Sequence, residues 1–239
     1  MSYQDASLIF NFPTKSRPER FQIALQSILQ NIKRKDKISF SVTLDNNCTR
    51  LHEYTAICKD NNIVYQLVNS KNKIDAFNKF IYANWFNDII ISTSDDMVFT
   101  HYGFDEVIRK DMSEQFDARG GLLHYNDGFQ RSNVCTLSIV SGDYYCQDGY
   151  IYHPDYESVW CDVEATDVAK ARNQYRYMGD DIQLFKHVHP SWGIIPYDQQ
   201  YLITENSELN EKDKQTYLKR KEHGFPSTSI YTDTYITWS

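Results

Sequence analysis

Two adjacent aspartates, Asp95 and Asp96, come directly after the run IIISTS at residues 89–94. Carboxylate oxygens are the ligands that Mg²⁺ and Mn²⁺ prefer, often together with phosphate oxygens of a substrate. Neighbouring side chains of an extended chain point to opposite sides, so one aspartate can contact a cation while the other reaches a hydroxyl group of the ligand. Taken alone, the pair is more typical of an ordinary loop or a helix start.

A late histidine pair, His187 and His189, is a second candidate for metal chemistry. If this segment is extended, both imidazoles lie on one side of the chain, and a ring nitrogen can complete a cation site. The alternative is a surface turn before Pro190. The chain has only 9 glycines and contains neither G-x-G-x-x-G nor G-x-x-x-x-G-K-[ST], so dinucleotide and P-loop sites lose their support.

Apolar patterning in the first half alternates between strand and helix. The predicted strands cover residues 7–13, 38–45, 63–69 and 88–94, and the predicted helices cover 18–33, 49–61 and 73–86. Such alternation predicts βαβ units in a mainly parallel sheet with helices on both faces. Ligands of these sheets bind outside the carboxyl ends of the strands. Four polar segments therefore meet at one edge: residues 13–17, 45–47, 69–72 and 94–97.

The second half of the chain is less regular. Its predicted elements are a helix at 102–116, a strand and turn at 120–128, a strand followed by a helix or loop at 135–149, and helices at 162–175 and 206–224. The tail at 225–239 is compatible with an edge strand, an oligomer contact or a flexible end. We find no internal repeat or clear linker, so we expect a single domain.

Composition narrows the class of protein. The net charge of −7 disfavours a general nucleic-acid groove, because phosphate binding needs clustered Lys and Arg. The five cysteines form no C-x-x-C pair, so neither a disulfide framework nor a zinc site is indicated. The sequence shows no secretory signal and no apolar run of the roughly 20 residues that span a bilayer. We expect a soluble, cytoplasmic protein.

The order of these motifs resembles that of the GT-A fold glycosyltransferases, close to the family 2 type. The resemblance is carried by Pro13, Thr14 and Arg17 after the first strand, Asp45 after the second, the segment NKIDAFNKFI at 72–81, and SDDM at 94–97. It covers residues 7–100 well and continues more weakly through KHVHPSWG at 186–193. It implies one Rossmann-like GT-A domain over residues 1–239, with a nucleotide-sugar-binding half at 1–100, an acceptor and catalytic half at 101–200, and a C-terminal helix and tail at 201–239.

The resemblance also implies roles for individual residues. The nucleotide-sugar-binding residues would be Pro13, Thr14, Arg17, Asp45, Lys73 and Asp95. The metal ligands would be Asp96 and either His187 or His189, and the general base would be Asp162 or, as second choice, Glu164. The motif departs from D-x-D because it reads Ser94-Asp95-Asp96. The acceptor half lacks the motifs of processive synthases, which favours transfer of a single sugar.

The expected activity is transfer of a hexosyl or pentosyl group from a nucleoside diphosphate sugar, with UDP-sugars favoured, to an acceptor hydroxyl. The cofactor would be Mn²⁺ or Mg²⁺, and a single displacement would invert the anomeric centre. The acceptor stays open among a glycan, a protein, a small molecule and a modified nucleic acid. The alternatives are a nucleotidyltransferase of related fold and a non-catalytic protein that binds nucleotide sugars.

Overall fold

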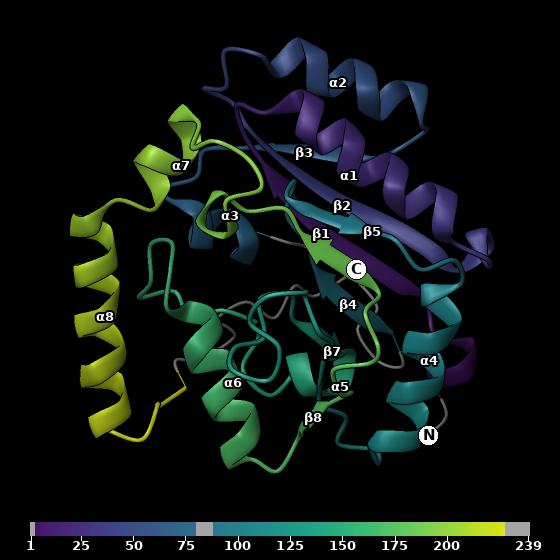
Figure 1. The fold of residues 1–239 in the computed structure, drawn as a ribbon, viewed down its shortest axis with the longest axis vertical. Helices are drawn as coiled ribbons and strands as arrows, with labels where there is room; N and C mark the ends of the chain where they lie inside the picture. Colours follow the sequence, from purple (N-terminus) through teal and green to yellow (C-terminus); the bar gives the residue numbers. More distant parts are fainter. Residues whose placement is uncertain (1–2, 80–87, 228–239) are drawn as a thin grey trace, which may run out of the picture.

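The computed structural model describes residues 3–79 and 88–227 of the chain. A seven-stranded sheet in the order β3-β2-β1-β4-β7-β6-β8 forms its centre (Figure 1). These strands are β1 (Leu8–Thr14), β2 (Ile38–Asp45), β3 (Tyr65–Val68), β4 (Ile89–Ser92), β6 (Leu122–His124), β7 (Ile139–Ser141) and β8 (Tyr175–Tyr177). A separate two-stranded sheet pairs β5 (Met97–Phe99) with β9 (Phe185–His187).

Strand pairing confirms the predicted α/β class with a mainly parallel sheet. β1 runs parallel to β2 and to β4, and β2 runs parallel to β3. β7 is antiparallel to both β4 and β6, whereas β8 is parallel to β6. The first four strands therefore end at the same edge of the sheet, with Thr14, Asp45, Val68 and Ser92 as their last residues.

Helices connect the strands, and two further helices come after the last strand in the sequence. They are α1 (Pro18–Asn31), α2 (Leu51–Asp60), α3 (Lys73–Asn78), α4 (Phe104–Gln115), α5 (Gly142–Tyr145), α6 (Cys161–Ala171), α7 (Gln199–Thr204) and α8 (Ser207–Glu222). Short 3₁₀ helices are η1 (Tyr3–Asp5), η2 (Lys35–Lys37) and η3 (Pro190–Trp192). Local sequence explains several starts: Pro18 occupies the first turn of α1, and Asn72, Asp198 and Asn206 cap α3, α7 and α8 through their side chains.

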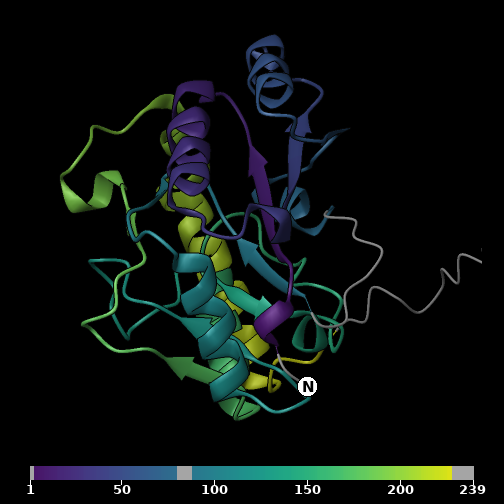
Figure 2. The same cartoon turned by 90° about the vertical axis from the view of Figure 1, so that its right-hand side faces the viewer.

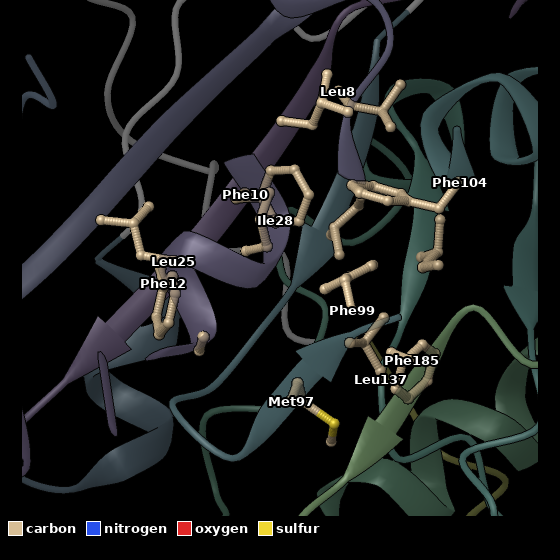
Figure 3. Packing of buried hydrophobic residues seen from close by; sticks show 14 of the residues in the cluster. Leu8, Phe10, Phe12, Leu25, Ile28, Met97, Phe99, Phe104, Leu137 and Phe185 are labelled. Atoms are coloured by element: carbon tan, nitrogen blue, oxygen red, sulfur yellow. The ribbon is translucent and has the colours of Figure 1, made fainter. Parts of the chain in front are cut away.

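The two faces of the sheet carry separate apolar clusters. Alternate β1 residues Leu8, Phe10 and Phe12 pack with apolar residues of α1 and α4, which lie on the same side of β1 in Figure 2. Phe10 and Phe99 meet edge to face, with their ring centroids 5.7 Å apart (Figure 3). Ile9 faces the other way and packs with residues of α5 and α6. Period-two alternation along β1 thus divides the core between the two faces.

The elements that patterning did not predict are short. β5, β8 and β9 have three residues each, and α7 has six. The helix predicted at 73–86 begins at Lys73 as α3 but already ends at Asn78, with Lys79 as its C-cap, and residues 80–87 lie outside the described part of the chain. Residues 228–239 of the predicted tail also lie outside it. Within the described residues, no helix is both long and apolar enough to cross a membrane.

Replacing Phe10 tests the core on the α1 face. Phe10→Ala is expected to lower the free energy of unfolding by about 3–5 kcal/mol, because the ring is fully buried and its removal leaves a cavity. The control Ile23→Ala removes a side chain on α1 that is 59% exposed, and it should cost less than about 0.5 kcal/mol. Urea denaturation measures both. A loss below about 1 kcal/mol for Phe10→Ala would contradict the packing described.

Candidate functional site

The segment between β4 and β5 places two carboxylates at the edge where the parallel strands end. The amide of Thr93 donates to the carbonyl of Asn11 on β1 at 3.0 Å, and the amide of Met97 closes a turn onto Ser94 at 3.2 Å. Asp95 and Asp96 lie within this turn and are only 5% and 7% exposed. Backbone bonds to neighbouring strands therefore fix both aspartates before any ligand is present.

Asp95 is held by residues that follow β1. Arg17 donates through Nε and Nη2 to the two carboxylate oxygens of Asp95, at 3.1 and 2.5 Å, and the Thr14 hydroxyl donates at 3.2 Å. Burial raises the pKa of Asp95 to about 6, although Arg17 acts in the opposite direction. These two parallel hydrogen bonds fix the orientation of the Arg17 guanidinium as well as that of the Asp95 carboxylate.

Asp96 faces the C-terminal part of the chain. Pairing of β5 with β9 sets Met97 opposite His187, and the amide of Val188 donates to the Asp96 carbonyl at 2.8 Å. The Asp96 side chain accepts hydrogen bonds from the Ser94 hydroxyl and from the Tyr201 hydroxyl of α7. Burial opposes ionisation of Asp96, but His187 holds the pKa of this carboxyl well below its usual range.

The two histidines differ in their hydrogen bonding. His187 Nε2 lies 3.6 Å from Asp96 Oδ2, and its Nδ1 lies 3.6 Å from Asp127 Oδ2. Burial disfavours its charged form, yet Asp127 and Asp96 together raise the pKa of His187 to about 9. In His189, Nδ1 accepts from the amide of Ser191 at 3.2 Å, and Nε2 lies 2.9 Å from Glu205.

Asp96, His187 and His189 form a group that could hold a metal ion. Each offers one ligand atom, and these atoms lie within 4.8 Å of one another. Mg²⁺ binds its ligands at about 2.0–2.1 Å, so small side-chain rotations would let one ion contact such a group. Carboxylate donors suit Mg²⁺ and Mn²⁺, whereas imidazole donors suit transition metals more generally.

Two cavities meet at Asp96 of this group. The first, of about 330 Å³, lies over the ends of β1 and β2 and between α3 and α7, which lie near each other in Figure 1. The second, of about 490 Å³, extends toward α6 and the histidine segment. The residues that line both are Lys73, Phe77, Ser94, Asp96 and Glu205. The second Asp of the pair therefore sits where the two cavities join.

Most residues singled out from the sequence lie on these cavities. The first is lined by Pro13, Thr14, Arg17, Asp45, Lys73 and Asp95, and the second by Lys73, Asp96, Asp162, His187 and His189. Burial raises the pKa of Asp162, whose Oδ1 accepts from the amide of Val163. Burial opposes the charge on Lys73, but Glu205 and Asp96 raise its pKa.

Glu164 lies away from the two joined cavities. Its carboxylate accepts from Arg220 of α8, with Nε to Oε2 at 2.8 Å and Nη2 to Oε1 at 2.9 Å, and from the Tyr156 hydroxyl at 2.8 Å. Glu164 and Arg220 are 4% and 7% exposed. The structure therefore places Glu164 in a buried ion pair that joins α6 to α8.

Sequence reasoning missed three residues of the site: Asp127, Tyr201 and Glu205. Tyr201 bonds Asp96 and receives the Arg17 guanidinium over its ring, with 4.4 Å from Cζ to the ring centroid. All three come from short or irregular segments, where neither apolar periodicity nor a motif marks them. For Tyr201 and Glu205 the only signal was their position in the polar C-terminal third, which was too weak to select them, and Asp127 carried no such signal.

Comparisons with known proteins identify the fold. No protein-family model matches the sequence, and no curated protein matches it. Three similar solved structures are the mannosyltransferase PcManGT of Pyrobaculum calidifontis with GDP-Man and Mn²⁺, S. aureus TarS 1–349, and glucosyl-3-phosphoglycerate synthase of Mycobacterium tuberculosis with Mn²⁺, UDP and phosphoglyceric acid. Their TM-scores are 0.54, 0.58 and 0.55, and their sequence identities to this chain are 12%, 11% and 10%. The matches cover 72%, 91% and 93% of this chain and 54%, 72% and 80% of the respective other chains.

These likenesses show that the chain has the GT-A fold, as the sequence resemblance implied. The chain spans 54% of the length of PcManGT and 43% of the longer TarS chain. At identities of 10–12%, the comparisons concern the fold alone. The chemistry of this chain has to be argued from its own residues.

The ion pair of Glu164 supplies a test of its structural role. Glu164→Ala is expected to lower the free energy of unfolding by about 3–5 kcal/mol, because it leaves the buried Arg220 guanidinium with only the longer ion pair to exposed Asp155, at 3.7 Å. Lys170→Ala changes an exposed residue of the same helix and should cost less than about 0.5 kcal/mol. Chemical denaturation measures both. Equal stability of the two variants would show that the pair does not fasten α8 to α6.

Proposed function

We propose that this protein is a metal-dependent glycosyltransferase that moves one sugar from a nucleoside diphosphate sugar to an acceptor hydroxyl. The observation that carries the proposal is the junction of two cavities at Asp96, beside His187. Such an arrangement suits a donor in one cavity and an acceptor in the other, with the reacting bond between them. Structural neighbours with the same fold were solved with GDP-Man, UDP and UDP-GlcNAc.

The donor belongs in the first cavity. Asp45 accepts from the amide of Ser70 at 2.9 Å and lies 3.4 Å from Lys15, so its carboxylate is positioned to contact the base or ribose. Thr14 and Arg17 orient Asp95 for the ribose or the donor sugar. Lys73 is the one lysine or arginine among the described residues that lines both cavities, so we assign it to the diphosphate. UDP-sugars remain the favoured donors.

Asp96 and His187 are the residues that would hold Mn²⁺ or Mg²⁺. Buried His187 Nδ1 has no hydrogen-bond partner within 3.5 Å among the described residues, and it faces Asp127. A hydrogen on Nδ1 directed at Asp127 leaves the Nε2 lone pair for a cation, which is the usual carboxylate–histidine–metal order. When bound, the ion would stabilise negative charge on the departing diphosphate as a Lewis acid.

His189 fits the role of ligand less well than His187. Its Nδ1 already accepts the Ser191 amide, so the hydrogen of the neutral ring is on Nε2 and points to Glu205. Binding of a cation at Nε2 would require that hydrogen to move to Nδ1, against the Ser191 N–H. We therefore assign the nitrogen ligand to His187 and a supporting role to His189.

Asp162 is the proposed general base. It lines the second cavity, opposite the donor, and burial raises its pKa, which strengthens it as a proton acceptor. It takes the proton of the acceptor hydroxyl while the oxygen attacks the anomeric carbon and the diphosphate leaves. One such displacement inverts the anomeric centre. A nucleotidyltransferase also binds two substrates, but an attacking phosphate oxygen is already ionised and needs no general base such as Asp162, which is why we place that alternative lower.

Metal-dependent donor binding tests the proposal. Thermal shifts of the wild-type protein are measured with UDP-, GDP- and CDP-sugars, with and without Mn²⁺. Asp96→Ala and His187→Ala should each abolish the Mn²⁺-dependent shift, because each removes a ligand, whereas His189→Ala should retain it. Asp117→Ala, at a carboxylate whose side chain is 63% exposed, is the matched control. A Mn²⁺-dependent shift that survives in Asp96→Ala would overturn the metal assignment.

The base assignment has its own test. Asp162→Asn should keep Mn²⁺-dependent donor binding but slow the release of nucleoside diphosphate by about 10²–10⁴-fold, the usual value of general-base catalysis. Glu164→Gln is the matched carboxylate-to-amide change on the same helix. Its amide oxygen can still accept from Arg220 and its amide nitrogen can donate to the Tyr156 hydroxyl, so the rate should stay within about tenfold. A rate lost in Glu164→Gln and kept in Asp162→Asn would reverse the two roles.

A further inference from the structure

The junction of the two cavities contains a carboxylate that has no role in the proposed reaction so far. Five residues line both cavities, and two of them, Lys73 and Asp96, are assigned to the diphosphate and to the metal. Glu205 is the remaining charged residue of the five. With the diphosphate at Lys73 and the acceptor in the second cavity, the transferred sugar has to lie at this junction, within reach of Glu205.

Glu205 is held in place by the end of α7 and by His189. Its amide donates to the carbonyl of Tyr201 at 2.8 Å, at the C-terminal end of the helix. His189 Nε2 lies 2.9 Å from Glu205 Oε2, while the Ser191 amide donates to His189 Nδ1 at 3.2 Å. The neutral imidazole therefore carries its hydrogen on Nε2, toward the carboxylate. The second histidine of HVHP thus supports Glu205.

The Glu205 carboxylate is ionised and open to the cavities. Burial opposes its ionisation, but His189 and Lys73 together lower the pKa of Glu205. The Glu205 side chain is 20% exposed, whereas that of Asp96 is 8% exposed. Among residues 3–79 and 88–227, only His189 pairs with this carboxylate, through Oε2. Oε1 is therefore available to a ligand at the junction.

The position of Glu205 is unfavourable for binding of the diphosphate. Burial opposes the charge on Lys73, and Glu205 is the strongest of the carboxylates that raise the pKa of this lysine. Glu205 thus competes with the phosphates for the same cation, and its own charge repels them. A carboxylate in this place has to be explained by another part of the donor.

Hydroxyl groups of a sugar are the chemical match for this carboxylate. An ionised carboxylate oxygen only accepts hydrogen bonds, so it binds hydroxyl groups and repels acidic ones. A hydrogen bond to a charged acceptor is also stronger than one between neutral groups. A residue that makes such a bond discriminates strongly between a sugar that carries the hydroxyl group and one that lacks it.

We propose that Glu205 determines which sugar is transferred, by accepting a hydrogen bond from one hydroxyl group of the donor sugar. The inference rests on the proposed function and adds a specificity-determining residue to it. His189 is the positioning residue that orients the Glu205 carboxylate. A donor sugar that lacks this hydroxyl group, or that carries a carboxylate in its place, binds poorly.

The second cavity keeps its shape without an acceptor, so donor binding can be measured alone. Asp213 of α8 accepts hydrogen bonds from the amides of Glu157, Ser158 and Val159, at 3.0, 2.9 and 2.9 Å. Residues 158 and 159 line the second cavity. This part of the wall is therefore held by the protein itself.

Comparing sugar nucleotides with free nucleotides tests the role of Glu205. Calorimetry with Mn²⁺ gives the Kd of UDP, UDP-glucose, UDP-galactose and UDP-N-acetylglucosamine, and of GDP and GDP-mannose. For the sugar nucleotide that the wild-type protein binds most tightly, Glu205→Ala should raise the Kd by about tenfold, the value of a hydrogen bond to a charged group. The Kd of the matching free nucleotide should stay the same or fall, because a charge that opposes the phosphates is removed.

Glu208→Ala, at an exposed glutamate of α8, is the matched control and should change neither Kd. Unchanged binding of the free nucleotide also shows that Glu205→Ala is folded. An equal loss of affinity for the sugar nucleotide and the free nucleotide, or no loss for either, would overturn the inference.

Monodeoxy analogues of the same sugar nucleotide identify the hydroxyl group that Glu205 binds. At one position of the sugar, loss of the hydroxyl group should raise the wild-type Kd by about tenfold. The same analogue should change the Kd of Glu205→Ala by less than about twofold, because the bond is already absent there. Equal effects in both proteins at every position would contradict a bond to Glu205.

Two substitutions of His189 test its positioning role. His189→Ala should weaken sugar-nucleotide binding by a smaller factor than Glu205→Ala and leave free-nucleotide binding unchanged. His189→Gln, whose amide N–H can replace the ring N–H, should restore the affinity for the sugar nucleotide. Loss of Mn²⁺-dependent binding of the free nucleotide in His189→Ala would instead make His189 a metal ligand and overturn its positioning role.

The same measurements separate the two levels of the proposal. Failure of every nucleotide and sugar nucleotide to bind with Mn²⁺ would defeat the proposed function and the role of Glu205 together. Mn²⁺-dependent binding of a sugar nucleotide, with no selective loss in Glu205→Ala, would defeat the role of Glu205 alone.

Discussion

Asp95 and Asp96 are neighbours in sequence and are both buried, so desolvation and mutual repulsion act against their ionised forms together. Two separate positively charged groups compensate the two carboxylates. Arg17, from the loop after β1, forks onto Asp95, and His187, from β9, lies against Asp96. Without a cation, a proton on His187 supplies the charge that Asp96 and Asp127 require, and a divalent ion would satisfy the same demand.

This division of charge explains why distant parts of the chain must meet. The pairing of β5 with β9 brings the histidine segment beside the aspartates, and α7 adds Tyr201 to the same carboxylate. Tyr201 also receives the Arg17 guanidinium over its ring. The two cavities are thus linked through a few shared contacts, and each is lined by residues from both halves of the chain.

The sequence predicted the parallel strands and their polar ends because long apolar runs and βαβ spacing are local signals. Asp45, Asp95 and Asp96 follow from that pattern alone. Asp127 and Glu205 could not be found in this way, because they act only after tertiary pairing brings them to His187 and His189. Strands of three residues, such as β5 and β9, are too short for alternation to mark. Glu164 and Asp162 lie two positions apart on α6, and only packing against α8 distinguishes them.

The carboxylate of Asp213 also sets an order of assembly. It accepts hydrogen bonds from three consecutive backbone amides at 157–159, a stretch that lines part of the second cavity, from a position 55 residues after Ser158. During synthesis, the strands of the sheet leave the ribosome before α7 and α8 do. Residues of α7 line the first cavity, and Asp213 of α8 holds one side of the second, so both cavities take their full shape only when the last two helices have been made.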